Sequence, residues 1–446
     1  MTECDILVIG GGPTGSTAAM VAARRGAKVI LLDKESHPRF RIGESLLPRH
    51  WALLKELGLE ERVRRLPRTR KLGASFVMGG DETPRDFWFA SSLNTGEKEA
   101  INIAREPFDA MLAEASAESG ADHRTGVAVK SVASLSDAGA EILTSHGESI
   151  RARVLIDASG QATLLARHLG TRATLPDLRK VAHYGHFKGV SWREGDVAGS
   201  IVIVMCDEGW FWLIPLDAEH VSIGLVVGLD VVKQAGVAAN QVLRWGIERC
   251  PYVRNLLRNA TWPDRNYVTA DYSYQCKPYA GPGYFLAGDA AVFVDPIFST
   301  GVCLGMMSAR EAADHAVAIC RDPASAPRRR RDYIRFVEGS SETFFRLVRG
   351  YYTHAFRELF LEGQGPFNVH GAIMTLLAGH VFPRPAWRLR WRQRFFEAAV
   401  WMQQRRALAP RRARWSLVSA PVERLPAPEL KPALPLNSNA EALVRA

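Results

Sequence analysis

A glycine-rich turn near the start of the chain, residues 10–15 with the sequence Gly-Gly-Gly-Pro-Thr-Gly, constrains the fold more than any other segment. The turn follows a short apolar run at 5–9 and precedes an alanine-rich stretch at 17–25 with good helix propensity. A second apolar run, residues 28–32, comes next and ends at Asp33. Strand, glycine turn, helix and strand in this order predict a βαβ unit with a parallel sheet.

The spacing within this turn fits the G-x-G-x-x-G pattern of dinucleotide-binding proteins. Gly10 permits the tight turn, Gly12 lets the backbone approach a pyrophosphate, and Gly15 allows the helix to pack close to the strand. Asp33, at the end of the second strand, is placed to accept hydrogen bonds from a ribose. We therefore predict a bound dinucleotide, and the alternative is a glycine-rich turn without a ligand.

Length and composition exclude several classes of protein. The chain has 446 residues, of which 47% are hydrophobic, which is enough for a large core and two or three domains. Its mean hydropathy is −0.09, and it has no apolar run of about 20 residues, so no membrane span is expected. The six cysteines lack metal-ligand spacing and the first residues lack a signal-peptide pattern, so we expect a cytoplasmic protein with reduced cysteines and no metal.

The net charge of +10 is unusual and has several explanations. Arginine greatly outnumbers lysine, as in a GC-rich genome, so part of the charge reflects codon usage. An acidic protein partner is a second explanation. No nucleic-acid partner is expected, because no recognised binding motif accompanies the arginines.

The distribution of apolar and polar residues predicts the domain organisation. A nucleotide-binding domain is expected over 1–310, interrupted by an antiparallel sheet that faces the substrate and is built from about 72–104 and 175–275. A helical C-terminal region follows over 311–419, rich in aromatic residues and arginine. Repeated prolines predict an extended tail over 420–446.

Two later segments favour FAD over NAD as the dinucleotide. Residues 157–160 have the sequence Asp-Ala-Ser-Gly after a buried strand, and residues 288–291 have the sequence Gly-Asp-Ala-Ala between a strand and a helix. They resemble the segments of FAD-dependent aromatic hydroxylases that return to the nucleotide. The resemblance implies that Asp289 meets the ribityl hydroxyl groups.

Three segments make the resemblance more specific: Arg-Ile-Gly-Glu-Ser-Leu-Leu-Pro at 41–48, Gly-Trp-Phe-Trp-Leu-Ile-Pro at 209–215, and Asp-Pro-Ile-Phe-Ser-Thr-Gly at 295–301. Together and in this order they resemble the flavin-dependent halogenases, and the middle segment matches the W-x-W-x-I-P motif of that family. The resemblance covers about residues 4–310. It implies an α/β fold with an FAD-binding Rossmann-type domain of the aromatic-hydroxylase kind. It also implies a reaction in which FADH2, O2 and chloride or bromide halogenate an electron-rich aromatic ring.

The turn Ser299-Thr300-Gly301 precedes a helix predicted to begin near Val302. Free backbone N–H groups and the positive end of a helix dipole suit an anion. By resemblance, the amides of Thr300 and Gly301 hold the halide against the flavin. The alternative is an ordinary helix N-cap made by the side chain of Ser299 or Thr300.

Lys71 matches the position of the catalytic lysine of this family and is the only lysine between Glu56 and Glu97. Burial lowers the pKa of a lysine and can make it nucleophilic, whereas arginine stays charged. The resemblance implies that hypohalous acid is delivered to Lys71, which either forms a chloramine or donates a hydrogen bond. The alternative is a solvated surface lysine beside Arg68 and Arg70.

Aromatic residues are expected to separate the flavin from the substrate. Trp210 and Trp212 alternate along a strand, so both indoles point to one face, where the resemblance implies a wall and the alternative is ordinary core packing. Phe298 stands where tryptophan halogenases carry a glutamate, which disfavours an indole substrate. The D-P-x-F-S-x-G form resembles the halogenases of phenols and pyrroles, whose substrates are often tethered to an acyl or peptidyl carrier protein. Phe87, Trp88 and Phe89 are further candidates for the pocket lining.

The resemblance places further residues near the flavin. They are Pro13, Thr14, Lys34, Arg41, Gly43, Glu44, Ser45, Arg105, Asp157, Gly160, Gly288, Asp289, Pro296 and Gly301. The chain has no second dinucleotide fingerprint, so a separate flavin reductase is expected, in secondary metabolism such as antibiotic biosynthesis. The competing functions are an FAD-dependent aromatic hydroxylase and a non-catalytic escort protein of the same fold.

Overall fold

The predicted βαβ unit is present in the structure, a computed structural model. It consists of β1 (Thr2–Ile9), α1 (Pro13–Arg24) and β2 (Val29–Asp33), and β1 and β2 pair in parallel. The structure describes residues 2–80, 83–94, 96–270, 272–426 and 428–445. The first sheet has the strand order β18-β19-β10-β1-β2-β7, in which β19, β10, β1, β2 and β7 run parallel. Its other strands are β7 (Asp122–Thr125), β8 (Val129–Ser136), β9 (Gly139–Thr144), β10 (Ser149–Asp157), β18 (Ala280–Gly281) and β19 (Tyr284–Leu286).

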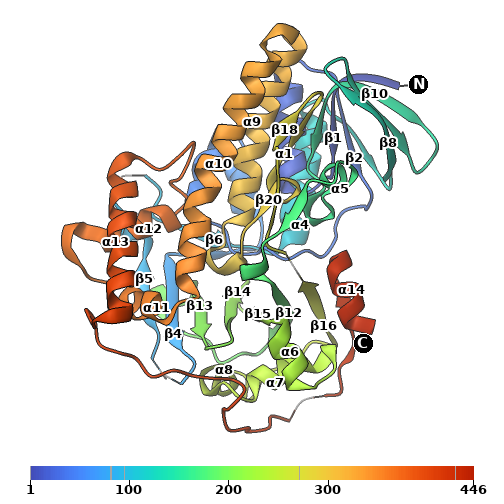
Figure 1. Cartoon of the computed structure of the whole chain (residues 1–446). Helices are drawn as coiled ribbons and strands as arrows, with labels where there is room; N and C mark the ends of the chain where they lie inside the picture. The colour runs from blue at the N-terminus through green and yellow to red at the C-terminus, as the bar shows by residue number, and fades with distance from the viewer. Residues whose placement is uncertain (1, 81–82, 95, 271, 427, 446) are drawn as a thin grey trace.

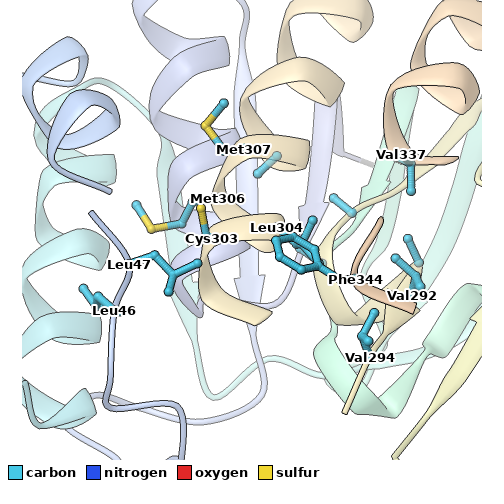
Figure 2. Close-up of a cluster of buried hydrophobic side chains, with 14 of the residues drawn as sticks. Leu46, Leu47, Val292, Val294, Cys303, Leu304, Met306, Met307, Val337 and Phe344 are labelled. Atoms are coloured by element: carbon cyan, nitrogen blue, oxygen red, sulfur yellow. The ribbon is translucent and has the colours of Figure 1, made fainter. Parts of the chain in front are cut away.

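Long helices pack beside this sheet (Figure 1). Helix α1 contacts both α4 (Arg105–Glu118) and α9 (Gly301–Arg321), and α9 also packs along α10 (Ala326–Tyr351). The start of α9 is held in an apolar cluster between the loop that carries Leu46 and Leu47 and side chains of α10 (Figure 2). The turn before α9, where the halide site is predicted, is therefore attached to a rigid helix.

A second sheet lies apart from the first and has the order β21-β16-β12-β15-β14-β13-β4-β5. Its strands pair antiparallel except for β13 with β4 and β16 with β21. The strands are β4 (Gly73–Met78), β5 (Arg85–Trp88), β12 (Lys180–Lys188), β13 (Ile201–Met205), β14 (Gly209–Pro215), β15 (His220–Gly228), β16 (Arg265–Ala270) and β21 (Lys431–Pro435). One face belongs to the main core and the other packs against a smaller core.

Shorter elements lie between these strands and helices along the chain. They are α2 (Arg49–Glu56), α3 (Glu60–Arg65), β3 (Thr69–Lys71), β6 (Ala100–Asn102), α5 (Leu164–His168), β11 (Arg172–Thr174), α6 (Leu229–Ala235), α7 (Val242–Ile247), α8 (Pro251–Leu256), β17 (Tyr274–Cys276) and β20 (Val292–Phe293). After α10, the chain forms α11 (His354–Glu362), α12 (Val369–Leu377) and α13 (Trp387–Arg405). Among the described residues, no helix is long and apolar enough to span a membrane.

The last segment of the chain differs from the extended tail predicted over 420–446. Strand β21 pairs in parallel with β16, and α14 (Ser438–Arg445) follows it. The backbone N–H of Lys431 donates to the carbonyl oxygen of Asp264 at 2.9 Å, and that of Leu436 donates to Val268 at 2.8 Å. An edge strand offers unpaired backbone groups on one side, so a proline-containing segment can pair there without a complete ladder.

Candidate active site

The glycine turn has the geometry that the motif predicts. Gly10 has a φ of +103°, in the left-handed region that favours glycine, and a Cβ on Gly15 would lie 1.7 Å from the carbonyl oxygen of Gly10. A Cβ on Gly12 would have only one neighbour within 4 Å, an Arg39 nitrogen at 3.9 Å, so the backbone there is open to a ligand. No side chain caps the N-terminus of α1. The free amides at this end therefore suit a pyrophosphate.

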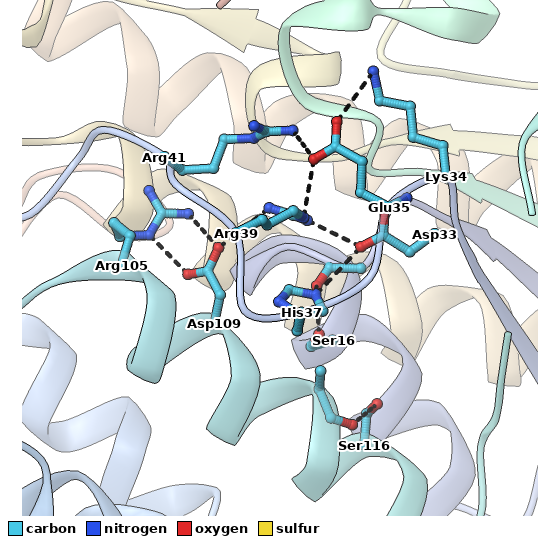
Figure 3. A network of polar contacts seen from close by, with 12 residues as sticks. Ser16, Asp33, Lys34, Glu35, His37, Arg39, Arg41, Arg105, Asp109 and Ser116 are labelled. Carbon is cyan, nitrogen blue, oxygen red and sulfur yellow. Dashed lines mark hydrogen bonds and ion pairs between the residues drawn. The ribbon is translucent and has the colours of Figure 1, made fainter. Parts of the chain in front are cut away.

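Asp33 is buried and accepts bonds from the protein itself (Figure 3). Its Oδ2 lies 3.0 Å from Arg39 Nη2 and 3.3 Å from His37 Nε2, and its Oδ1 accepts a hydrogen bond from the backbone N–H of Glu35 at 3.2 Å. Burial raises the pKa of Asp33, but the hydrogen bond from His37 and the charge of Arg39 outweigh burial and lower the pKa to about 2. The carboxylate predicted to meet the ribose is thus ionised and already held in place.

Arg39 extends this network towards the helix that carries Arg105 (Figure 3). Arg39 Nη1 lies 3.6 Å from Asp109 Oδ2, and Arg105 donates to both carboxylate oxygens of Asp109, at 2.8 and 2.9 Å. Arg105 also donates to the carbonyl oxygen of Ile42 at 2.5 Å. Neither Arg39 nor Asp109 was predicted from the sequence, because nothing in their local pattern shows that residues 70 positions apart pair.

Several residues predicted to lie near the flavin contact other groups of the protein. Lys34 is exposed beside Glu35, and Arg41 donates to Glu35 Oε2 at 2.6 Å. Asp157 accepts from the backbone N–H groups of Ser159, at 2.9 Å, and Leu165, at 2.7 Å, so its carboxylate organises the loop that contains Gly160.

A second group of residues predicted to lie near the flavin is found where the segment that contains Gly288 meets the glycine turn. A Cβ on Gly288 would lie 2.6 Å from Thr14 Oγ1, which explains the glycine at this crossing. Pro13 and Pro296 each occupy the first turn of a helix. Burial raises the pKa of Asp289 to about 7, although the charge of Arg105 opposes that change.

The loop at 41–48 passes from this network to the second sheet. Gly43 has a φ of +106°, and a Cβ there would lie 2.9 Å from Arg105 Nη1. The Glu44 side chain is buried, and its Oε1 lies 2.6 Å from His186 Nε2. Its other oxygen, Oε2, is buried without a hydrogen-bond partner, an arrangement that is costly unless a ligand supplies a donor.

Lys71 is buried, with 1% of its surface exposed, so the alternative of a solvated surface lysine is wrong. It ends β3, and its Nζ donates to Ser45 Oγ at 2.8 Å and to the carbonyl oxygen of Leu46 at 3.2 Å. Burial lowers its pKa to about 7. Ser45, predicted to lie near the flavin, is therefore the hydrogen-bond acceptor of Lys71.

A cavity of about 30 Å³ lies beside Lys71. Its lining is otherwise mainly apolar: Leu47, Ala74, Phe76, Phe89, Ile201, Ile297, Phe298, Ser299, Met374 and Leu377. This volume fits a species of water size and is too small for an aromatic ring. Phe298 lines the cavity, and so does Phe89, one of the candidates for the pocket lining, but Phe87 does not. Phe87 stacks on Phe360 of α11 at a centroid distance of 4.7 Å.

The turn before α9 has free amides close to the same cavity. Ser299 has a φ of +56°, which is uncommon for a residue other than glycine. Thr300 is the buried N-cap residue of α9, but no side chain caps this end, so the ordinary-cap alternative is wrong. The amides of Thr300 and Gly301 begin a helix of 21 residues, and the positive end of its dipole favours an anion.

Trp210 and Trp212 lie on the same face of β14, as predicted, with their ring centroids 5.9 Å apart. Trp212 Nε1 donates to Ser222 Oγ at 3.2 Å, and Trp210 Nε1 donates to Tyr352 Oη at 3.1 Å. A Cβ on Gly224 would lie 2.2 Å from the Trp212 ring, so glycine makes room for this indole. Both rings are buried and hydrogen-bonded, so both indoles have fixed positions.

Comparison with known proteins identifies relatives of this chain. Residues 3–327 match the protein family described as FAD binding domain. A tryptophan 2-halogenase of Chondromyces crocatus is 32% identical over 403 residues, covering 85% of this chain and 76% of the relative. A 1H-pyrrole-2-carbonyl-[peptidyl-carrier protein] brominase of Pseudoalteromonas luteoviolacea is 31% identical over 317 residues, covering 70% and 76%.

A solved structure agrees with these relatives. The flavin-dependent brominase Bmp2 superposes with a TM-score of 0.80 at 25% identity, covering 91% of this chain and all of that protein. The fold match includes the second sheet and the C-terminal helices, because it extends well past residue 327, where the family match ends.

Proposed function

Because this chain belongs to the flavin-dependent halogenases, within the FAD-binding-domain family, we propose that it halogenates an electron-rich phenolic or pyrrolic ring with hypohalous acid that Lys71 holds. The protein is an FAD-dependent oxidoreductase with chloride or bromide as co-substrate. These relatives favour halogenation over direct aromatic hydroxylation. The proposal adds the residues that act and the class of ring that reacts.

FAD fits the residues of this site on observations of the chain itself. The uncapped N-terminus of α1 and the open backbone at Gly12 suit the pyrophosphate. Arg39 and Arg105 provide positive charge along the path from Asp33 to the loop at 41–48. The unpaired Oε2 of Glu44 marks where a donor on the ring system would lie. The bound flavin, once reduced, supplies the electrons with which oxygen converts a halide to hypohalous acid.

The chain's part in the reaction begins with the halide. We assign its binding to the amides of Thr300 and Gly301, which no side chain caps. A backbone site of this kind binds by charge and geometry, so it suits both chloride and bromide. The adjacent cavity is lined by both Ser299 and Lys71, and its volume of about 30 Å³ admits a species as small as hypohalous acid.

Lys71 then holds the oxidised halogen beside the substrate. Because its pKa is about 7, the amine exists in both charged and neutral forms at neutral pH. The charged form donates a hydrogen bond that polarises hypohalous acid, and the neutral form has the lone pair that a chloramine requires. Ser45 and Leu46 fix the Nζ atom in either case.

The substrate class follows from the apolar residue at 298. In the D-P-x-F-S-x-G form Phe298 lines the cavity, so no carboxylate at this position assists deprotonation of an indole. Phenols and pyrroles are electron-rich without such help. The pyrrole brominase relative supports a ring tethered to a peptidyl carrier protein. The tryptophan 2-halogenase relative is a reason to include indoles in the test.

Trp210 and Trp212 keep the organic substrate from the flavin, so that only the small oxidant passes from the flavin to the substrate. A separate flavin reductase supplies the reduced cofactor. We further propose that the enzyme works in the cytoplasm, within secondary metabolism; the free thiols of all its cysteines are compatible with a reducing compartment.

The observation that carries this proposal is the buried Lys71 beside a cavity that ends at the uncapped halide turn. The test is incubation of the FAD-loaded protein with a reductase, O2 and chloride or bromide. The substrate panel comprises free phenols, free indoles and pyrroles tethered to a carrier protein. Mass spectrometry should find a halogen isotope pattern in phenol or pyrrole products, and none after Lys71→Ala, while flavin binding and oxygen uptake persist. Product with added oxygen in place of halogen, or undiminished halogenation by Lys71→Ala, would refute it.

A further inference from the structure

A chain of hydrogen bonds joins the tryptophan strand to the halide turn. Trp210 Nε1 donates to Tyr352 Oη at 3.1 Å, and Tyr352 Oη donates to Asp295 Oδ2 at 2.6 Å. The other oxygen of Asp295, Oδ1, accepts from the backbone N–H of Ile297 at 3.1 Å. Tyr352 directly follows α10, so the C-terminal region provides the centre of a connection between two motifs more than 80 residues apart.

One hydroxyl group serves both neighbours. An indole N–H is a donor only, and Trp210 is buried, so Tyr352 Oη is the acceptor that satisfies it. The Asp295 carboxylate is buried with no exposed surface, and it has the Tyr352 hydroxyl and the Ile297 amide as its hydrogen-bond donors. The ammonium group of Lys180 lies 4.6 Å from the centre of the Tyr352 ring and places a positive charge beside this pair.

The neighbouring tyrosine contacts the other end of the same turn. The ring of Tyr351 meets that of Phe298 edge-on at a centroid distance of 5.9 Å. Tyr352 therefore contacts the start of the segment Asp295–Phe298, and Tyr351 contacts its end. Ser299, with its left-handed φ of +56°, comes next and leads to Thr300.

We propose that Tyr352 is a positioning residue that fixes the halide turn and the Trp210 wall in one arrangement. This inference rests on the proposed function, because it takes the amides of Thr300 and Gly301 as the halide site. Without the hydroxyl, Asp295 loses a donor, and the short helical turn Pro296–Phe298, which Asp295 caps through the Ile297 amide, loses part of its support. The amides of Thr300 and Gly301, two and three residues after Phe298, then lose their alignment, and the halide binds more weakly.

The size of the effect follows from the bond that is lost. A hydrogen bond to a buried carboxylate is stronger than one between neutral groups, and its loss corresponds to about a tenfold to hundredfold change in an equilibrium constant. Because the turn between Asp295 and the two amides transmits only part of this change, we expect about a tenfold increase in the halide concentration that half-saturates the enzyme. The rate at saturating halide should fall much less, because Lys71 is untouched. An unanchored Trp210 should also let more reduced flavin react without product, with release of hydrogen peroxide.

The experiment compares Tyr352→Phe with Tyr333→Phe in the full-length, FAD-loaded protein. Tyr333 is a matched control because it lies on α10, is buried, and donates its hydroxyl to the carbonyl oxygen of Leu286 at 2.6 Å. Two readouts are titrated with sodium bromide: halogenated product with the reductase present, and the Tm of the oxidised protein. The second readout reports halide binding without turnover. Sodium sulfate at equal ionic strength corrects for a general salt effect.

The inference predicts that the bromide concentration at the midpoint of both titrations is about tenfold higher for Tyr352→Phe and unchanged for Tyr333→Phe. Equal midpoints for Tyr352→Phe and the unaltered protein would overturn it. If Tyr352→Phe does not fold, Asp295→Asn removes the charge that the hydroxyl holds, and it must shift the bromide midpoint in the same direction or the inference fails. Lys71→Ala serves as the separate test of the proposed function: it should abolish product but leave the Tm midpoint in place. Product that survives Lys71→Ala refutes lysine delivery, while the Tm titration still decides the role of Tyr352.

Discussion

Replacement of Lys71 by methionine should reveal the energetic cost of the buried amine. Burial moves the pKa of Lys71 from 10.5 to about 7, which corresponds to about 5 kcal/mol of lost stability when the amine is protonated in both the folded and unfolded states. Lys71 is 1% exposed, so solvent screens little of this cost. Methionine has a similar length and no charge. The variant should therefore be more stable than the unaltered protein at pH 7 and below.

The difference between the two proteins should depend on pH in a defined direction. Between pH 7 and pH 10.5 the unfolded chain keeps the proton of Lys71, whereas the folded chain releases it. The unfolded state thus binds more protons, and stability rises with pH. From pH 7 to pH 9 the unaltered protein should gain about 2 kcal/mol of unfolding free energy relative to Lys71→Met.

Urea denaturation of the FAD-loaded proteins at pH 7, 8 and 9, followed by tryptophan fluorescence, measures this difference. Lys188→Met is a suitable control, because the Lys188 side chain is exposed at the end of β12. A stability difference between the unaltered protein and Lys71→Met that is the same at pH 7 and pH 9 would show that Lys71 keeps its proton on folding. The argument that burial adapts this lysine to its function would then be wrong.

Three further changes test other parts of the site. Gly15→Ala places a methyl group 1.7 Å from the Gly10 carbonyl oxygen, so the purified protein should lack flavin absorbance; a yellow protein would contradict the tight turn. Arg105→Met leaves the buried carboxylate of Asp109 without its main partner and should lower the urea-derived unfolding free energy by about 3–5 kcal/mol, whereas a loss below 1 kcal/mol would mean that the pair is dispensable. Leu377→Ala enlarges the cavity at Lys71, at a cost of about 2–5 kcal/mol, and should raise the halogenation rate of bulky rings relative to small ones; an unchanged ratio would place substrate entry elsewhere.

The parts of the site that the sequence predicts are those built from short-range patterns. The glycine turn, the parity of Trp210 and Trp212, and the position of Thr300 at a helix N-terminus all depend on local geometry. Lys71 was identified by its position in the family pattern and by the scarcity of lysine around it. In the first three cases the relevant neighbours lie within a few residues along the chain, whereas the burial of Lys71 against Ser45 and Leu46 depends on a distant segment.

The parts that sequence reasoning missed depend on contacts between distant segments. Arg39 with Asp109, and Tyr352 with Asp295, meet only because the sheets and helices bring them together. The directions of the side chains in and after the short strand β5 were also hard to predict from the sequence. Of the three aromatic candidates at 87–89, Phe89 lines the cavity from beyond the end of the strand, whereas Phe87 stacks on Phe360 of α11. No periodic pattern marks that change.

The small cavity has a consequence for how substrate and oxidant meet. A space of about 30 Å³ beside Lys71 admits hypohalous acid but no aromatic ring, so a substrate can reach the lysine only by displacing lining side chains. Met374 and Leu377 line the cavity from α12, and Tyr352, which directly follows α10, donates to Asp295 in the turn before α9. The C-terminal region therefore contacts both the turn before α9, where we propose that the halide binds, and the cavity beside Lys71. Halide binding and ring binding should consequently be coupled, and the coupling should weaken when either the Tyr352 hydroxyl or the Leu377 side chain is removed.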